Sequence, residues 1–510
     1  MKRRAAVGLL VGVCLLEAGC SREQPATTDR STSAASAGAV GTYATVPDWY
    51  KAPPPVRSYP SPADTIHKWI QAGDSVHIRA HAWDMWQSIT TPANDTMPVW
   101  ETWYAGHEIF PTINVEPHVA TMNAAPAELR RHRLKHRFEV SRQKVHTGVR
   151  GRTRSPDFAE RWFSFNRYTR PTATLIYKTR LWDYPTLRDT NRAFNRLNTP
   201  IANREVRVSM GPVDPQSIVL KPVFQFVDGK NPSCIPYWNG HTAATTSDTL
   251  NPIAKTWLQF VVFDPTNALK GAKQAGPGIQ GCPPGKSWLV VQPSSFYNVV
   301  LTQEMADSLS VFAEESGDDI GAGNDTSVAA IKAMAKPGNI ALLVAMHVTG
   351  KEIVEWTWQT FWWSPTPNDS LGFDRPATIQ SPWNNYQMNT AYQMVTPAHS
   401  RNNDTARVAY NPYLETSLCE NQSRDCANSK WYGVSTNCMS CHRMAAWKDT
   451  SVKGTASFTN PPYVPAQYVD KADPKYFGGY TKTDFLWSVA IRTFVPRVPP
   501  GVKCDTCKSP

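Results

Sequence analysis

The stretch of the chain that most restricts its folding is the five-residue sequence Cys438-Met-Ser-Cys441-His442. On a helix, residues three and four apart lie on one face, so both thiols and the imidazole would point the same way. Two thiols and an imidazole presented together can form a disulfide, bind a metal or hold a covalently attached group. The rest of the chain must therefore build a surface against which these three side chains can lie together.

The spacing C-x-x-C-H is the pattern through which c-type haem is attached to proteins. The thiols of Cys438 and Cys441 would form thioethers with the two haem vinyl groups, and His442 would give iron its proximal nitrogen. Two other interpretations stay open: a disulfide followed by a chance histidine, and half of a zinc site. We predict one covalent haem c, held by these three residues.

Residues around the motif resemble those of a known class of proteins. The segment Asn437–Ala445 resembles the haem-attachment segment of bacterial c-type cytochromes. The later segment Thr483–Ser488 is similar to one that follows the motif in some exported single-haem proteins with a large upstream domain. A strand pair like Leu343–Gly350 also occurs in such proteins. The resemblance implies haem binding and electron transfer by an exported c-type cytochrome.

The N-terminus is typical of a bacterial export signal. Basic residues 2–4 precede an apolar run over 5–16, which is too short to span a bilayer. The sequence Leu16-Glu-Ala-Gly-Cys20 resembles the lipobox of bacterial lipoproteins, with Glu17 in place of the usual aliphatic residue. We expect a periplasmic protein whose Cys20 carries lipid and anchors it to the membrane.

The other cysteines suit an oxidising compartment, where disulfides form and persist. Six cysteines remain once those of the signal peptide, the lipid site and the C-x-x-C-H motif are set aside: Cys234, Cys282, Cys419, Cys426, Cys504 and Cys507. Sequence alone cannot fix their pairing, but closeness along the chain favours the pairs Cys234–Cys282 and Cys419–Cys426. Cys504 and Cys507 form a second C-x-x-C, for which a disulfide, a second haem and a metal site stay open.

Apolar periodicity predicts an α+β fold. The predicted regions are a signal peptide over 1–19, a lipidated and disordered tether over 20–60, a mixed helical region over 61–204, a β-rich domain over 205–365 and a haem domain over 366–510. We expect the β-rich domain to be antiparallel and sandwich-like, and the haem domain to be mainly helical and cytochrome c-like. The chain has 42 Pro, which favours many loops and turns.

Individual elements follow from local patterns. Predicted helices cover 63–72, 74–89, 127–145, 382–395, 437–447 and 483–492. Predicted strands cover 99–104, 217–227, 256–263, 287–292 and 340–348, and the last opens a hairpin that ends at 363.

The segment 127–145 is the most basic run in a chain whose net charge is +11. This run is compatible with three interpretations: a solvated helix face, a docking surface for an acidic partner or membrane, and a nucleic-acid site. We predict a solvated helix face, and no nucleic-acid partner because an exported protein rarely meets one.

The second axial ligand of the iron decides between electron transfer and catalysis. Soluble electron-transfer cytochromes usually close this position with Met or His, yet neither residue follows Met444 in the chain. We favour Met388 or Met394 as the distal ligand. The other upstream candidates are His399, Met346 and His347, and a Lys or Tyr ligand or a vacant position also stays open.

Three functions remain compatible with these features. We expect an exported c-type cytochrome that passes electrons to a periplasmic redox partner protein. The alternative is a haem-dependent oxidoreductase, such as an oxygenase, peroxidase or dehydrogenase, with an open or displaceable distal site. A third is a binding protein whose β-rich domain recognises a ligand.

Overall fold

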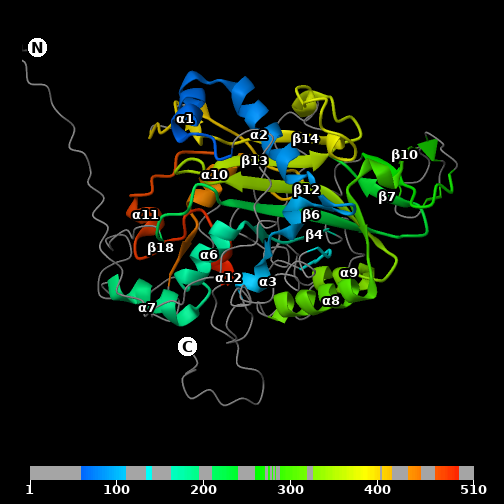
Figure 1. Ribbon diagram of the computed structural model, residues 1–510, viewed down its shortest axis with the longest axis horizontal. Coiled ribbons are helices and arrows are strands. Elements are labelled where there is room, and N and C mark those ends of the chain that lie inside the picture. Colours follow the sequence, from blue (N-terminus) through cyan, green and yellow to red (C-terminus); the bar gives the residue numbers. More distant parts are fainter. Residues whose placement is uncertain are drawn as a thin grey trace, which may run out of the picture. The chain divides into compact units, whose positions relative to one another are not determined.

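The centre of the fold is a strand whose residues are almost all apolar. Residues Ile340–Gly350 form β12, and every residue of this strand except His347 is buried. A run of this kind requires protein on both faces of the sheet, because successive side chains point to opposite faces. β12 accordingly lies inside the main sheet, between β6 (Ile218–Val227) and β13 (Thr357–Trp363), as Figure 1 shows.

The computed structural model describes residues 59–110, 134–139, 162–194, 210–238, 259–269, 274–275, 278–279, 282, 288–318, 326–401, 405–415, 435–448 and 466–492. All of them belong to one unit of the chain, Thr45–Pro510. Within these ranges no helix combines the length and the apolar character that crossing a bilayer requires. The predicted signal peptide, the tether and its Cys20, and the cysteines 419, 426, 504 and 507 lie outside the described residues.

Antiparallel pairing builds an eight-stranded main sheet around β12. Its other strands are β3 (Tyr104–Ala105), β4 (Trp162–Ser164), β5 (Arg167–Tyr168), β11 (Asn298–Val300) and β14 (Tyr386–Thr390). The order is β14–β13–β12–β6–β5–β3, with β11 paired to β12 and β4 paired to β6. The α+β class and the antiparallel pairing of the main sheet are thus confirmed, and the predicted hairpin is the β12–β13 pair.

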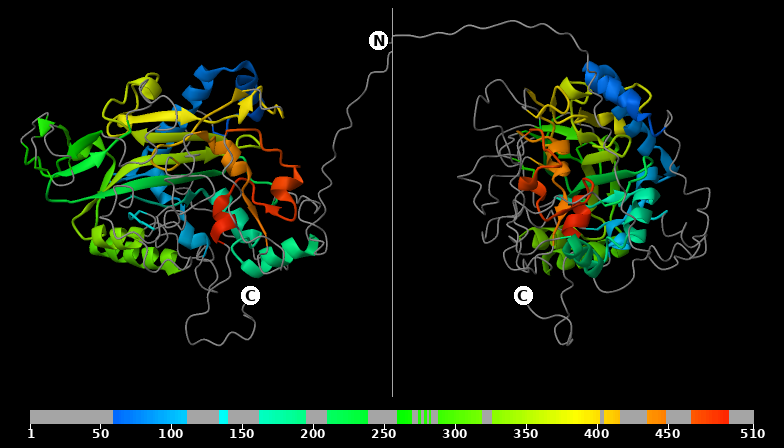
Figure 2. Two further views of the ribbon diagram at one scale, coloured as in Figure 1. Left: turned by 180° about the vertical axis from the view of Figure 1, so that it is seen from behind. Right: turned by 90° about the vertical axis from the view of Figure 1, so that its left-hand side faces the viewer.

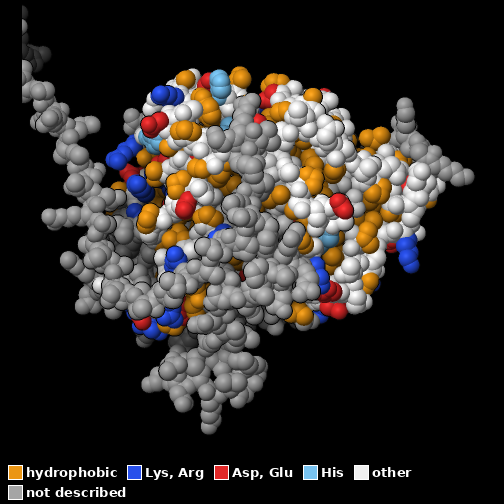
Figure 3. Space-filling view, in the orientation of Figure 1, with side chains coloured by type: hydrophobic (Ala, Val, Ile, Leu, Met, Phe, Trp, Pro, Cys, Tyr) orange, Lys and Arg blue, Asp and Glu red, His pale blue; other side chains and the backbone are white. Residues whose placement is uncertain are grey.

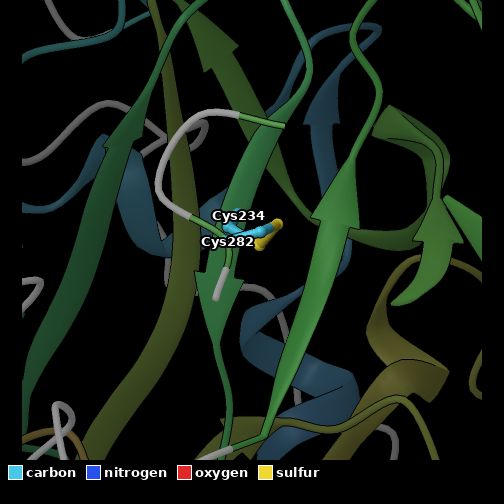
Figure 4. Close-up of a disulfide and its surroundings, with 2 residues drawn as sticks. All are labelled: Cys234 and Cys282. Atoms are coloured by element: carbon cyan, nitrogen blue, oxygen red, sulfur yellow. A yellow bond between two sulfur atoms is a disulfide. The ribbon is translucent and has the colours of Figure 1, made fainter. Parts of the chain in front are cut away.

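A smaller four-stranded sheet carries the disulfide. Its strands, in order, are β7 (Ser233–Pro236), β8 (Phe260–Phe263), β10 (Trp288–Val291) and β9 (Gln274–Ala275). Cys234 of β7 is bonded to Cys282, which confirms the predicted pairing (Figure 4). The bond ties a loop to the edge of this sheet, beside a small core that contains Phe260 and Trp288.

Two helices near the N-terminal end of the described chain cover one face of the main sheet. They are α1 (Ala63–Ala72) and α2 (Ser75–Ile89), close to the predicted bounds. Asp74 caps the start of α2 by accepting a hydrogen bond from a backbone N–H of its first turn. The ring of Trp86 stacks on Phe361 of β13, with ring centroids 4.2 Å apart. This aromatic stack fixes α2 on the sheet.

The opposite face of the main sheet contacts the C-terminal part of the chain. Trp358 is three residues from Phe361 on β13 and therefore points the other way. Its ring lies 4.3 Å from the ring of His442 in α10 (Cys438–Arg443), centroid to centroid. The right-hand view of Figure 2 shows the sheet between the blue helices α1 and α2 and the orange α10.

The described residues beyond 366 do not form a mainly helical domain. Their helices are short: α10, α11 (Pro474–Phe477) and α12 (Trp487–Arg492). The two-stranded ladders β15 (Val395–Thr396) with β16 (Thr405–Ala406), and β17 (Ala446–Trp447) with β18 (Thr481–Lys482), lie among them. The predicted helices over 437–447 and 483–492 thus shrink to α10 and α12.

The described ranges contain further helices. They are α3 (Gly106–Ile109), α6 (Arg170–Lys178), α7 (Tyr184–Phe194), α8 (Gln303–Asp318) and α9 (Thr326–Met334).

The helix predicted over 382–395 is wrong. A single 3-10 turn, η9 (Trp383–Asn385), leads into the strand β14, which pairs with the open edge of β13. The pairing buries Tyr386 and Met388 against neighbouring strands. The backbone hydrogen bonds that this segment forms with β13 therefore stabilise a strand more than its weak helical periodicity favours a helix.

The strand predicted over 99–104 is also wrong, because residues Val99–Thr102 form a 3-10 turn, η2. In a strand, Trp100 and Glu101 would point to opposite faces. In the turn both are buried, and the Glu101 carboxylate accepts a hydrogen bond of 2.6 Å from the Tyr297 hydroxyl.

The basic run is not a solvated helix where the structure describes it. Residues 134–139 are not helical, and the side chain of Arg137 is only 8% exposed. Its guanidinium lies 2.9 Å from the Glu108 carboxylate and donates to the carbonyl of Trp103. Figure 3 shows basic and acidic side chains interspersed on the described part of the visible face. At least one basic side chain of this run, that of Arg137, therefore forms an ion pair within the fold.

We predict that Phe361→Ala lowers the free energy of unfolding by about 3–5 kcal/mol, because it removes a fully buried ring from the α2–sheet contact. Phe373→Ala is the matched control, since Phe373 is 72% exposed and should change stability by less than about 0.5 kcal/mol. Urea unfolding of the two variants measures both effects. Equal losses would contradict this packing.

Candidate haem-attachment site

The motif forms the short helix α10, which is anchored at its first residue. The side-chain oxygen of Asn437 accepts a hydrogen bond of 3.1 Å from the backbone N–H of Ser440 and so caps the helix. The amide nitrogen of Asn437 donates to the carbonyls of Gln393 and Arg407, at 3.1 and 2.7 Å. One side chain thus starts the helix and ties it to two neighbouring segments.

The helix presents the three motif side chains on one side. Cys438, Cys441 and His442 are partly exposed, whereas Met439 and Arg443 are buried. The guanidinium of Arg443 lies 3.2 Å from the Glu355 carboxylate on the buried side. Two thiols and one imidazole therefore share a face, as the spacing predicts.

The two thiols of the motif are not bonded to each other. Cys438 Sγ lies 3.2 Å from the carbonyl of Ala409, and the Trp487 indole donates to the carbonyl of Cys441. Burial raises the pKa of both thiols, to about 12 for Cys441, and the charge of Glu415 adds to the rise. Both thiols are consequently protonated at neutral pH.

The imidazole of His442 is held in one orientation. Its Nδ1 lies 2.9 Å from the carbonyl oxygen of Phe485 and donates to it, which leaves the lone pair on Nε2. Burial lowers the pKa of His442 to about 4, so the ring is neutral at pH 7. Among the described residues Nε2 has no hydrogen-bond partner. A neutral ring with one nitrogen tied to a carbonyl is the usual state of a metal-binding histidine.

A strained turn brings the carbonyl of Phe485 to His442. Asp484 and Phe485 have φ angles of 45° and 68°, in the left-handed region that non-glycine residues rarely adopt. Each such residue costs of order 1–3 kcal/mol unless its surroundings hold it. The Asp484 carboxylate lies 2.9 Å from Lys351 Nζ, and this ion pair secures the turn.

A second group of polar side chains lies on the sheet beside the motif. His347 Nε2 is 2.6 Å from the Glu415 carboxylate, and Lys221 stands directly across from His347 on β6. The other oxygen of Glu415 accepts from the backbone N–H of Asn411 at 2.6 Å. The charge of Lys221 lowers the pKa of His442 and the charge of Glu415 raises it, so these groups act on the motif directly.

The two methionines predicted as distal ligands do not lie on the exposed side of the motif. Met388 is paired with Phe361, so its side chain points toward α2, whereas His442 lies on the other face of the sheet. Met394 lines a small cavity together with Met439 and His399, behind α10. These placements give no support to either sulfur as an axial ligand.

Sequence reasoning missed two groups that hold the site. Glu415 stands alone in a stretch without periodicity, and no local signal connects it with His347, 68 positions away. Phe485 acts through its backbone carbonyl, which no side-chain pattern can reveal. His347 was a candidate on sequence grounds, and its partial exposure within an otherwise buried strand distinguishes it.

Within the described ranges no group of three or more His, Cys, Asp or Glu side chains is arranged to hold a metal ion. A haem site needs no such group, because the porphyrin provides four of the ligands to iron and the protein only the axial ones.

Comparisons with known proteins provide no relative of this chain. No family model, no curated protein and no solved structure matches it.

We predict that Asn437→Ala lowers the free energy of unfolding by about 2 kcal/mol, because the helix cap is lost and two carbonyls lose their donor. Asn437→Ser restores a capping oxygen but no amide, and should recover about 1 kcal/mol of this loss. Thermal or urea unfolding provides the comparison. Identical stability of the two variants would argue against the cap.

We predict a pH effect in the polypeptide made without haem. The ordinary pKa of His442 is 6.5 and the folded-state pKa is about 4, so the unfolded chain takes up this proton first. The stabilising effect of the neutral ring is complete above pH 6.5 and is lost as the pH falls toward 4. His442→Asn, which can still donate to the Phe485 carbonyl, should lose less stability over this interval in urea titrations. Parallel pH profiles of the two proteins would contradict the neutral state of the folded imidazole.

Proposed function

We propose that this chain is an exported c-type cytochrome that carries one haem on Cys438, Cys441 and His442 and transfers single electrons in the bacterial periplasm. The observation that carries the proposal is the state of His442. Its ring is neutral, its Nδ1 is bound to the Phe485 carbonyl and its Nε2 is available on the same face as two unpaired thiols. This is the donor set that covalent haem requires.

The two other interpretations of the motif fit these residues less well. A disulfide between Cys438 and Cys441 would leave no reason for the ordered imidazole beside them. A structural zinc site would need four ligands, and in the part of the chain that the structure describes no group of three or more His, Cys, Asp or Glu side chains is arranged to hold a metal ion. Thioethers to vinyl groups are uncharged, so the attached sulfurs could remain among the apolar neighbours of the motif.

Each residue of the site has a separate task. Haem supplies an iron that changes its charge by one electron. Cys438 and Cys441 fix the position of the group, and His442 donates its Nε2 lone pair to the metal. The Phe485 carbonyl accepts a hydrogen bond from Nδ1–H of His442, and this bond orients the ring and raises the basicity of Nε2. Trp358 packs against the ring of His442 and limits the access of water to it.

In this proposal the haem lies on α10 beside the main sheet, in a C-terminal region that is cytochrome c-like in its attachment motif. The predicted export signal and a lipid on Cys20 would place the protein at the periplasmic side of a membrane. Its partner would be a periplasmic redox protein.

A haem-dependent oxidoreductase is the second candidate. The observation in its favour is the group of ionisable side chains beside the motif, Lys221, His347 and Glu415, which could move protons to a bound substrate. Rapid binding of CO or cyanide to the native protein would favour this enzyme. Resistance to both would favour the electron carrier.

We predict that the chain acquires the mass of one covalent haem when it is produced with a cytochrome c maturation system. The double variant Cys438→Ala/Cys441→Ala should acquire none. The double variant Cys234→Ala/Cys282→Ala removes the disulfide instead and is the matched cysteine control, which should keep the haem.

Intact-mass spectrometry measures the three proteins side by side. A wild-type chain without added mass, from a host that matures a control cytochrome, would overturn the proposed function.

A further inference from the structure

Two histidines on facing elements share one feature of metal-binding histidines. His442 of α10 has its Nδ1 tied to the carbonyl of Phe485, and His347 of β12 has its Nε2 tied to the carboxylate of Glu415. Histidines that bind metals nearly always donate their second ring N–H to a carbonyl or a carboxylate. Each ring therefore keeps one nitrogen with a free lone pair, Nε2 in His442 and Nδ1 in His347.

The register of the sheet places His347 on the same face as the contact with His442. Trp358 of β13 is directly across from Thr349, and His347 is two residues before Thr349 on β12. His347 and Trp358 are thus diagonal neighbours on one face, about 7–8 Å apart. Because the Trp358 ring contacts the ring of His442, His347 lies beside the motif.

The loop that holds Glu415 also reaches the first cysteine of the motif. The Cys438 thiol lies 3.2 Å from the Ala409 carbonyl. Two residues later, the Asn411 amide donates to the Thr360 hydroxyl on the sheet, and its backbone N–H donates to the Glu415 carboxylate. Glu415 in turn holds His347. A short chain of contacts therefore connects the haem-attaching thiol with the ring of His347.

We propose that His347 is the second axial ligand of the haem, so that the group lies between α10 and the face of β12 and β13. This inference rests on the proposed haem attachment and adds the ligand that closes the site. It explains why His347 is the one residue of β12 that is not buried.

Other upstream candidates are less well placed. Met388 and Met346 are both paired with Phe361, on the face that α2 covers. Met394 and His399 line the cavity behind α10. Neutral nitrogen on both sides of iron, in place of a methionine sulfur, favours a lower reduction potential. The Glu415 carboxylate would lower it further by raising the basicity of His347.

The test compares the haem-loaded wild type with His347→Ala and with His399→Asn. His399 is the matched control because it lies behind α10, and asparagine tolerates its φ of 66°. The wild type and His399→Asn should have low-spin ferric spectra, no long-wavelength absorption band of methionine ligation, and slow CO binding. His347→Ala should be high-spin and bind CO rapidly, and added imidazole should restore the low-spin spectrum.

A further variant, Glu415→Gln, should keep the low-spin spectrum and raise the reduction potential, since glutamine is a weaker acceptor. A wild type with a methionine-type band or a high-spin spectrum, or an unchanged spectrum in His347→Ala, would overturn the assignment of His347. These measurements on the wild type need no variant to fold. Absence of covalent haem from the wild type would instead overturn the proposed function itself.

Discussion

The pairing register of β12 with β13 and β6 determines what the two faces of the main sheet present. With His347 across from Thr360 and Lys221, polar side chains face α10, and the row of Met346, Phe361 and Met388 faces α2. Side chains alternate along a strand, so a slip of one residue would exchange the two faces. The stack of Trp86 on Phe361 opposes such a slip, because the slip would turn the Phe361 ring away from α2.

The motif depends on this face but is also held from several other directions. Asn437 ties the start of α10 to segments on either side, and Arg443 pairs with Glu355 on its buried side. The turn at Phe485 holds the imidazole, at the cost of two residues in left-handed conformation. Strain of this kind persists only where the surroundings hold it, and it gathers at functional sites. A fixed imidazole suits an electron carrier, in which little should move when the charge of iron changes.

Sequence patterns predicted the parts of the fold that depend on local signals. Three features agree with expectation: the helices α1 and α2, the β12–β13 hairpin and the Cys234–Cys282 bond. Apolar periodicity and capping residues specify the helices and the hairpin, and the closeness of the two cysteines along the chain specifies the disulfide. The segment around Met388 was misassigned as a helix, because the edge of β13 recruits it as a strand. Met388 was also favoured as the distal ligand, whereas in the fold the main sheet lies between Met388 and His442.

Of the candidate site, the sequence predicted only the three side chains of the motif. The spacing of Cys438, Cys441 and His442 indicates one shared face, and the structure has it. The Phe485 carbonyl and the Glu415 carboxylate come from distant segments, and only the folded chain brings them to the two histidines. The most direct test of the account is the alkaline pyridine haemochrome spectrum of the purified wild-type protein. The account predicts the absorption of a c-type haem at one equivalent per chain, and a protein without haem absorption would contradict it.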